Sequence, residues 1–302
     1  MLAENPQASD EYRRRICRAI DFINRNLASN PSMIEIARAA PFSSFHFQRL
    51  FHALMGETVA DFTRRVRLET AARRLRFRSQ DDITGTAFDL GFSSSQNFAK
   101  AFKKHFGVSP TQYREQAQDH RDDAPVSFQA LDHSLSASES QTLELAKSVA
   151  VRELREARVV YRRHFGSYND PGVQAAFDAL ARWAKPRGLD HFDRYLGIPW
   201  DDAEVTPANR CRFDACLIVP VAARLDGGIN WQEIPAGRYA VHSCEVVQHD
   251  FDLPWTKLMR GWLPQSGYQP ADGPRFESYH SDGSTDLAGR WRIDVCLPVV
   301  PL

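Results

Sequence analysis

The chain has 302 residues, of which 43% are hydrophobic, and its 38 Lys and Arg balance 38 Asp and Glu to a formal net charge of zero. This length suggests about two domains. The sequence shows no bilayer-spanning apolar run and no signal-peptide core, and its five scattered cysteines exclude a disulfide framework, so we expect a soluble, cytoplasmic protein with free thiols and no membrane partner.

The zero net charge hides an asymmetry between the two parts of the chain. Residues 11–115 carry 18 Lys and Arg against 10 Asp and Glu, whereas the remaining residues carry 20 against 28. A cationic segment beside an anionic one is typical of a nucleic-acid-binding module fused to a second domain.

The first predicted element is a helix over residues 11–28. Its apolar positions recur at helical spacing and would form the buried face: Ile16, Ile20, Ile23 and Leu27. Arg13 to Arg15 could touch phosphate or simply lie in solvent, and we favour solvent.

Residues 32–54 predict a helix over Ser32–Ala39, a turn through Pro41, and a second helix from Ser44 to about Leu54. The apolar stripe of the second helix consists of Phe47, Leu50, Phe51 and Leu54. Outside that stripe lie Phe45, His46, Gln48, Arg49 and His52.

A long connecting helix is predicted next, over Val59–Arg78. This stretch contains neither Pro nor Gly, and its apolar residues are roughly in helical phase. Such a helix would hold the elements on either side of it at a fixed separation.

Residues 88–114 predict the end of one helix, a tight turn at Gly91 and a cationic helix that begins near Ser94. Ser93 is placed to cap the first turn, and Gly107 is placed to end the helix. Phe98, Phe102 and Phe106 would form its apolar face. The opposite face holds Ser95, Gln96, Asn97, Lys100, Lys103 and Lys104.

Taken alone, this segment is equally compatible with an ordinary amphipathic helix that has a solvated face. The layout of residues 32–54 repeats it at a period of about fifty residues, the size of a whole supersecondary unit. The repeat favours two DNA-reading helix-turn-helix units joined by a long helix.

The string from Gly91 to Arg114, with GF followed by AFKKHFG and VSPTQYR, resembles the AraC/XylS family of bacterial transcription regulators. The resemblance covers about residues 11–115 and implies an all-α domain whose two recognition helices enter successive major-groove segments. At the positions where that family contacts bases, this sequence has Phe45, Gln48 and Arg49 in the first helix and Ser95, Gln96, Asn97 and Lys100 in the second.

The side-chain chemistry agrees with that assignment. Arg49 can bind guanine through two hydrogen bonds, and the amides of Gln48, Gln96 or Asn97 can bind adenine in the same way. Phe45 could pack on a thymine methyl group. The ammonium groups are better suited to phosphates, which give affinity without sequence information: Lys100, Lys103 and Lys104.

The composition changes after residue 116. We expect domains at 11–116 and 146–302, with a polar linker at 117–145. The second domain begins with two strands around a turn at Glu156–Ala157, a helix over Asp170–Lys185, and strands at about 192–199 and 211–220.

A similar unit then recurs, with two strands around Pro235–Gly237, a helix near residues 251–267 and two closing strands. A strand–strand–helix–strand–strand order used twice implies a pseudo-duplicated α+β domain with two sheets side by side.

This second domain resembles the gyrase-inhibitor-like, or AraC effector-binding, domain over about residues 147–300. The motifs that carry the resemblance are QEIPAGRYAVHSCE (232–245), WLPQSGY (262–268), PRFESY (274–279) and the closing DVCLPV. The resemblance implies that a cleft carboxylate, here Glu277, meets a cationic, aromatic-bearing effector.

Alternation in the strand points Glu277 and Tyr279 to one face, where a carboxylate beside aromatic rings can hold a lipophilic cation. The candidate walls are Tyr161, Tyr168, Tyr195, Trp255 and Trp262. A strand glutamate can equally be solvent-exposed, and aromatic residues can equally be core.

The resulting hypothesis is a DNA-binding transcription regulator that responds to a small-molecule effector, with double-stranded DNA and RNA polymerase as partners. No catalytic residue, metal site or cofactor is predicted. The alternative is a hydrolase of small electrophiles in which Glu277 acts as general base with a tyrosine hydroxyl. The sequence contains no GxSxG, HExxH or GKS/T motif to support that alternative.

Overall fold

A computed structural model describes residues 6–40, 44–78, 80–119, 148–225, 228–247, 250–283, 285–286 and 288–302. The chain divides into two compact units on either side of residue 122. The predicted linker at 117–145 lies outside the described residues, apart from its first three positions, which end a helix.

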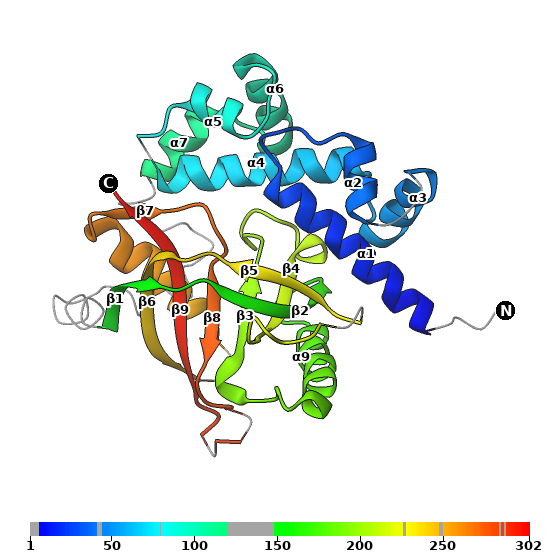
Figure 1. Ribbon diagram of the computed structural model, residues 1–302. Coiled ribbons are helices and arrows are strands. Elements are labelled where there is room, and N and C mark those ends of the chain that lie inside the picture. Colours follow the sequence, from blue (N-terminus) through cyan, green and yellow to red (C-terminus); the bar gives the residue numbers. More distant parts are fainter. Residues whose placement is uncertain are drawn as a thin grey trace. The chain divides into compact units, whose positions relative to one another are not determined.

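The described part of the first unit consists of helices. Their bounds are α1 (Pro6–Arg25), α2 (Met33–Ala39), α3 (Ser44–Met55), α4 (Val59–Phe77), α5 (Ile83–Asp89), α6 (Ser95–Phe106) and α7 (Pro110–Asp119). Figure 1 shows α4 running between α2 and α3 at one end and α5 to α7 at the other. The predicted pair of helix-turn-helix units joined by a long helix is confirmed.

Local side chains fix where these helices begin. Ser32 and Glu35 form a reciprocal capping box at the start of α2, and Thr58 and Asp82 cap α4 and α5. The core of the second helix-turn-helix unit gathers apolar residues from α4, α5 and α6: Leu68, Ala71, Ala72, Leu75, Ala87, Leu90, Phe98 and Phe102.

The second unit is α+β, as predicted. Its strands are β1 (Val149–Leu154), β2 (Ala157–Phe165), β3 (Tyr195–Pro199), β4 (Arg212–Ile218), β5 (Asn230–Ile234), β6 (Gly237–Val246), β7 (Tyr268–Pro270), β8 (Phe276–Tyr279) and β9 (Trp291–Pro301). Its helices are α9 (Pro171–Ala184) and α10 (Asp252–Thr256), and α10 continues as a π-helical segment, Lys257–Trp262.

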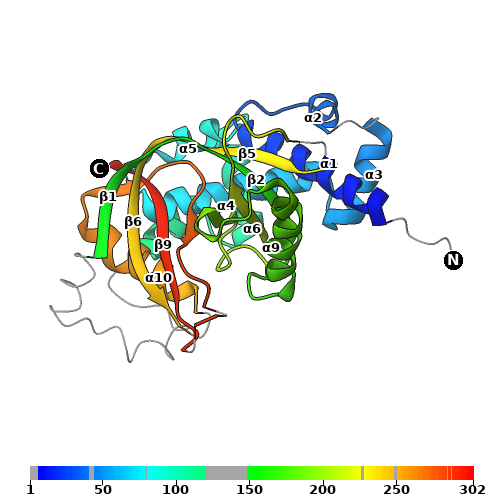
Figure 2. The same cartoon turned by 60° about the horizontal axis from the view of Figure 1, so that its bottom comes forward.

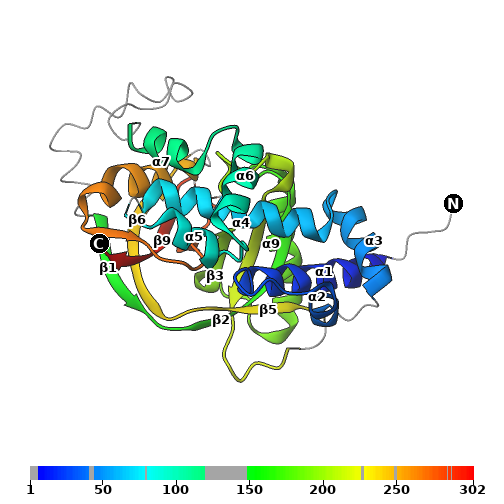
Figure 3. The ribbon, with the colours of Figure 1, turned by 90° about the horizontal axis from the view of Figure 1, so that it is seen from above.

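The strands form one antiparallel sheet in the order β1-β6-β9-β8-β3-β4-β2-β5, with the short β7 added to β9. Figure 2 shows β1, β6 and β9 curving side by side, and Figure 3 shows β5 beside β2 at the other end. The expectation of two sheets side by side was wrong, because β3 and β8 pair with each other and join the two halves into one sheet.

Each half also exchanges its first strand with the other half. β1 pairs with β6 rather than with β2, and β5 pairs with β2 rather than with β6. The two strands that flank each predicted turn are therefore not hydrogen-bonded to each other. The exchange gives the sheet a pseudo-twofold axis at the β3–β8 junction.

The pseudo-symmetry is visible in the sequence at a separation of 80 residues. Residues 212–217, RFDACL in β4, correspond to residues 292–297, RIDVCL in β9. Gly197 of β3 lies opposite Ala215 of β4, and Glu277 of β8 lies opposite Val295 of β9. Gly197 and Glu277 are therefore equivalent positions in the two halves.

Both helical segments contact the sheet face that carries Glu277. Phe177 of α9 packs on Tyr279, and Trp255 of α10 donates to Glu277. Proline at 254 and 264 and glycine at 261 interrupt the second helical segment, which accounts for its irregular course.

The five cysteines are free thiols, and four of them are buried. Among the described residues no helix combines the length and the apolar character needed to cross a bilayer.

Candidate DNA-reading helices and ligand site

Helix α6 presents the polar face expected of a DNA-reading helix. The Ser94 hydroxyl accepts from the Asn97 amide N–H at 3.1 Å, and Gly107 ends the helix in the left-handed region at φ +80°. Phe98 and Phe102 are fully buried. The remaining face carries Ser95, which is half-buried, and the exposed Gln96, Asn97, Lys100, Lys103 and Lys104.

The cap lies one residue later than predicted. Ser94 rather than Ser93 accepts from the first turn, whereas the Ser93 hydroxyl accepts from the Asn97 side-chain amide at 3.0 Å. Ser93 therefore orients the Asn97 side chain at the start of α6 and engages one of its amide hydrogens.

Helix α3 is held in the same way by aromatic packing. Phe47 and Phe51 are fully buried, with ring centroids 5.6 Å apart, and Phe51 packs edge-on against Phe62 of α4 at 5.5 Å. Gln48 and Arg49 are exposed on the opposite face. The Phe45 side chain lies outside the part of the chain that is described.

Glu277 lies at the centre of the second unit, in β8 beside the junction with β3. Its side chain accepts two hydrogen bonds, at Oε1 from the Trp255 indole N–H (2.7 Å) and at Oε2 from the Tyr279 hydroxyl (2.8 Å). The residue is 5% exposed, and this burial raises its pKa above the ordinary value although the two hydrogen bonds oppose the rise. The sequence prediction that Glu277 and Tyr279 share a face is confirmed by their hydrogen bond.

Directly opposite Glu277 the other half of the domain has Gly197. A Cβ atom there would lie 2.4 Å from Phe213 Cζ and 2.5 Å from the Tyr279 hydroxyl. Gly197 therefore makes the space that the Phe213 ring and the Tyr279 hydroxyl occupy. Because Gly197 and Glu277 are equivalent positions, only one half of the pseudo-symmetric domain carries a carboxylate at the junction.

Aromatic rings surround Tyr279. The ring centroids of Phe177, Trp291 and Phe251 lie 5.7, 6.1 and 6.3 Å from that of Tyr279, all in edge-to-face contact. Burial and the neighbouring Glu277 carboxylate raise the pKa of Tyr279 well above its ordinary value, so its hydroxyl stays a donor at neutral pH.

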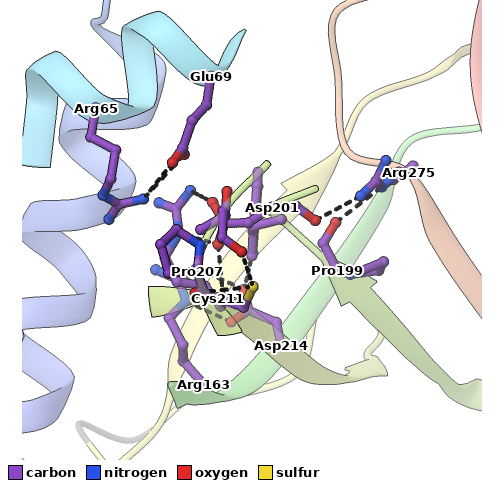
Figure 4. Close-up of polar contacts among 12 residues, drawn as sticks. Arg65, Glu69, Arg163, Pro199, Asp201, Pro207, Cys211, Asp214 and Arg275 are labelled. Atoms are coloured by element: carbon purple, nitrogen blue, oxygen red, sulfur yellow. Dashed lines mark hydrogen bonds and ion pairs between the residues drawn. The ribbon is translucent and has the colours of Figure 1, made fainter. Parts of the chain in front are cut away.

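Arg275 holds the junction together at the start of β8. Its guanidinium donates to the carbonyl oxygen of Asp201 (2.7 Å) and to that of Pro199 at the end of β3 (3.4 Å), as Figure 4 shows. The same group lies 5.5 Å from the centroid of the Trp255 ring. Arg275 thus links the two halves and positions the indole that donates to Glu277.

The structure brings some of the predicted wall residues to this site and separates others from it. Tyr195 lies on the same face as Glu277, packs on Phe177 at 6.2 Å and donates to Asp190. Tyr168 reaches the site through Phe213: the centroids of these two rings lie 6.0 Å apart, and Phe213 packs on Phe177.

Tyr161 and Trp262 lie apart from the carboxylate. Tyr161 is fully buried and, by strand register, points to the opposite face of the sheet, where Arg163 lies over its ring. Trp262 stacks on Tyr268 at 6.2 Å.

Several residues of the site were not predicted. Phe177, Phe251 and Trp291 line Tyr279, Arg275 positions Trp255, and Gly197 makes the space. Only Gly197 left a signal in the sequence, since a glycine inside a strand often marks a close approach.

Comparisons with known proteins assign both units. A GyrI-like small molecule binding domain matches residues 147–300, about half of the chain, and a helix-turn-helix domain matches residues 36–116. The first match spans Glu277 and its neighbours, and the second spans α3 and α6.

Two curated relatives are DNA gyrase inhibitors. The DNA gyrase inhibitor of Escherichia fergusonii is 33% identical over 132 residues, 43% of this chain and 83% of the relative. That of Escherichia coli K12 is 30% identical over 149 residues, 48% of this chain and 93% of the relative.

Among solved structures, an AraC-type transcriptional regulator from Chromobacterium violaceum is 24% identical over 34% of this chain and 91% of its own, with a TM-score of 0.33.

Proposed function

The chain belongs to the GyrI-like family of small-molecule-binding proteins and carries an AraC-type helix-turn-helix DNA-binding domain, and we propose that it is a transcription regulator whose DNA affinity responds to a cationic aromatic effector bound at Glu277. As such a regulator it would act in the cytoplasm on promoter DNA and contact RNA polymerase. The DNA gyrase inhibitor of Escherichia fergusonii matches 43% of this chain, and the helix-turn-helix domain at residues 36–116 favours regulation.

The proposed DNA contacts are the exposed polar residues of α3 and α6. Gln48, Arg49, Gln96 and Asn97 have the fork-shaped donors and acceptors that read purines in the major groove, and Ser95 and Phe45 flank them. Lys100, Lys103 and Lys104 follow along α6, where ammonium groups would hold phosphates.

Two substitutions separate base reading from phosphate binding. Arg49→Ala is expected to cost about 1–3 kcal/mol of binding free energy and to relax specificity at one base pair. Lys104→Ala is expected to weaken binding to all DNA sequences alike. It should also reduce the slope of log affinity against log salt concentration by about one. Binding titrations at several salt concentrations, on a site selected from random duplexes, measure both. An unchanged affinity and site preference for Arg49→Ala would refute the assignment of α3.

The effector site rests on one observation, the buried Glu277 carboxylate under an aromatic cluster. Burying a carboxylate without an ion-pair partner is unfavourable, and the two neutral donors Trp255 and Tyr279, together with the nearby charge of Arg275, offset only part of that cost. A lipophilic cation would supply the missing charge, and the surrounding rings would add cation–π contacts. The chemistry therefore favours a cationic aromatic ligand over an anionic one.

Glu277 as the general base of a hydrolase has weaker support. A general base must lie within hydrogen-bond reach of the proton that it removes. Both Glu277 oxygens already accept hydrogen bonds, from Trp255 and from Tyr279, so neither is aimed at a proton to be removed. This arrangement favours binding over proton transfer.

A ligand panel tests the effector proposal on the full chain. All six tryptophans, including Trp255, follow residue 122, so indole fluorescence reports on the C-terminal unit alone. Lipophilic aromatic cations are expected to quench it at micromolar concentration, and neutral compounds of the same shape are expected to bind at least about tenfold more weakly, the equivalent of 1.4 kcal/mol. Equal affinity for neutral compounds would refute the cation preference, and breakdown of a panel compound would support the hydrolase.

Regulation requires that the effector bind two states of the protein unequally. Saturating cation should therefore change the DNA affinity of the full chain, and by linkage DNA should change the affinity for the cation by the same factor.

A further inference from the structure

Arg67 connects the two helix-turn-helix units directly. It lies near the middle of α4, and its buried guanidinium donates to three acceptors outside that helix. Nε and Nη2 donate to the Leu27 carbonyl oxygen (3.0 and 2.6 Å), Nη2 donates to the Asn30 side-chain oxygen (3.1 Å), and Nη1 donates to the Gly91 carbonyl oxygen (3.4 Å).

These acceptors belong to different reading units. Leu27 and Asn30 lie in the segment between α1 and α2, ahead of the first reading helix α3. Gly91 lies in the turn between α5 and α6, immediately ahead of the second. One side chain therefore ties together the two backbone segments that position the DNA-reading helices.

The backbone on both sides is shaped for this contact. Asn30 is the non-glycine residue with positive φ in the described chain, at +53°, a conformation that asparagine tolerates better than most residues. Gly91 has φ +78°, and a Cβ there would lie 2.6 Å from the Leu27 carbonyl oxygen and 2.9 Å from that of Ala28. The α5–α6 turn thus packs directly on the end of the α1 segment, a contact only glycine allows.

We propose that Arg67, with Gly91 and Asn30, forms an inter-unit clamp that fixes the separation and the rotation between α3 and α6. Because of the clamp, specificity also depends on the number of base pairs between the two boxes, the DNA segments that α3 and α6 contact. Arg67 is a positioning residue in this proposal, which rests on the proposed DNA binding by α3 and α6.

The physical reason is the geometry of the duplex. Adding one base pair between two boxes moves the second by about 3.4 Å and turns it by about 35° around the axis, because a turn of about 34–36 Å holds about 10–10.5 base pairs. Helix α4 alone could bend or twist to follow such a shift. Arg67 resists it with three charged hydrogen bonds to the α1–α2 segment and one to the α5–α6 turn.

Spacing variants of the selected site test the clamp in the full chain. For the wild type, insertion or deletion of one base pair between the boxes is expected to weaken binding about 30-fold, because one reading helix loses its base contacts. For Arg67→Met, which keeps the apolar stem, the same change is expected to cost less than about threefold, with weaker binding to the original site. An equal penalty in both proteins would overturn the proposal.

Arg74→Met is the matched control. Arg74 lies two turns further along α4 and pairs with Asp89 of α5, inside the second reading unit. Its replacement removes a guanidinium from the same helix but leaves the connection between units intact, so the wild-type spacing penalty is expected. Loss of the penalty in this control would equally overturn the assignment to Arg67.

A distance measurement without DNA separates failure of the clamp from failure of the proposed function. Spin labels on the exposed positions 53 in α3 and 104 in α6 should give one narrow distance in the wild type and a broadened distribution in Arg67→Met. Should Arg67→Met not fold, Asn30→Gly removes one acceptor while allowing the positive φ, and a smaller broadening is expected. An unchanged distribution in the folded variant overturns the clamp, whether or not DNA binds.

Discussion

Replacing Asp214 by alanine is expected to lower the free energy of unfolding of the C-terminal unit by about 3–5 kcal/mol, because it leaves a buried guanidinium without its countercharge. Arg163 donates to both Asp214 oxygens, at 2.6 and 2.7 Å, and neither side chain is exposed to solvent. Trp200 (2.8 Å) and Gln232 (2.9 Å) donate to the same carboxylate. Figure 4 shows Arg163 beside Asp214.

The pseudo-symmetry of the domain provides the control. Asp294 occupies the equivalent position in β9, where it accepts from the Ser243 hydroxyl at 2.6 Å and pairs with His280 at 3.0 Å. This pair is partly exposed, at 19% for Asp294 and 44% for His280, so Asp294→Ala is expected to cost less than about 1 kcal/mol.

Urea unfolding of the full chain, followed by tryptophan fluorescence, measures both variants on the C-terminal unit alone. If the two alanine variants lost equal stability, the buried network around Asp214 would contribute no more than a surface ion pair.

The all-α unit was predictable from sequence because its determinants are local. Helical periodicity placed Phe98 and Phe102 in the core, and glycine at 91 and 107 marked the turns. The N-cap was misplaced by one residue because consecutive serines at 93 to 95 offer chemically equal caps, and only the backbone conformation of Ser94 decides among them. The clamp by Arg67 was not predictable, since its partners lie 24 to 40 residues away.

The strands of the second unit were predictable except for the short β7, but their partners were not. Alternation of apolar and polar residues shows which side chains share a face and says nothing about the neighbouring strand. The exchange of β1 and β5 between halves is therefore absent from the local pattern. Tyr161 illustrates the consequence: its position relative to Glu277 depends on a register across three strand pairs, and a shift of one residue would reverse its face.

Within the site, the pair Glu277 and Tyr279 followed from period-two alternation in one strand. Trp255 was identified by residue type, but its hydrogen bond depends on an irregular helix interrupted by proline. Phe177 reaches the site because α9 crosses the fused sheet, an arrangement that no local pattern encodes.

Glu277→Gln is expected to weaken binding of an aromatic cation by about 30-fold or more, because removing one partner of a buried charge pair costs about 2 kcal/mol or more. Glutamine keeps the shape of the side chain, and its oxygen can still accept from Trp255. Calorimetry or equilibrium dialysis on the full chain is the suitable measurement, since a changed hydrogen bond at Trp255 could alter fluorescence by itself.

Glu233→Gln provides a matched control, because it removes an exposed carboxylate from β5 of the same sheet and should leave the affinity unchanged. Equal affinity of Glu277→Gln and wild type for every cation would refute Glu277 as the charge anchor.

Glu277 is expected to make both stability and cation affinity depend on pH, with opposite signs. Burial raises the pKa of Glu277 in the folded state above its unfolded value, so its protonated form is favoured by folding. Without ligand, its contribution to stability is fully present below the unfolded pKa and is lost as pH rises through the raised folded pKa. Cation affinity must change in the other direction, because binding needs the ionised form and strengthens over the same pH range. The contribution of residue 277 to the pH dependence of stability and the pH dependence of cation affinity should both disappear in Glu277→Gln. If cation affinity in the wild type did not depend on pH across this range, another group would have to carry the charge that holds the ligand.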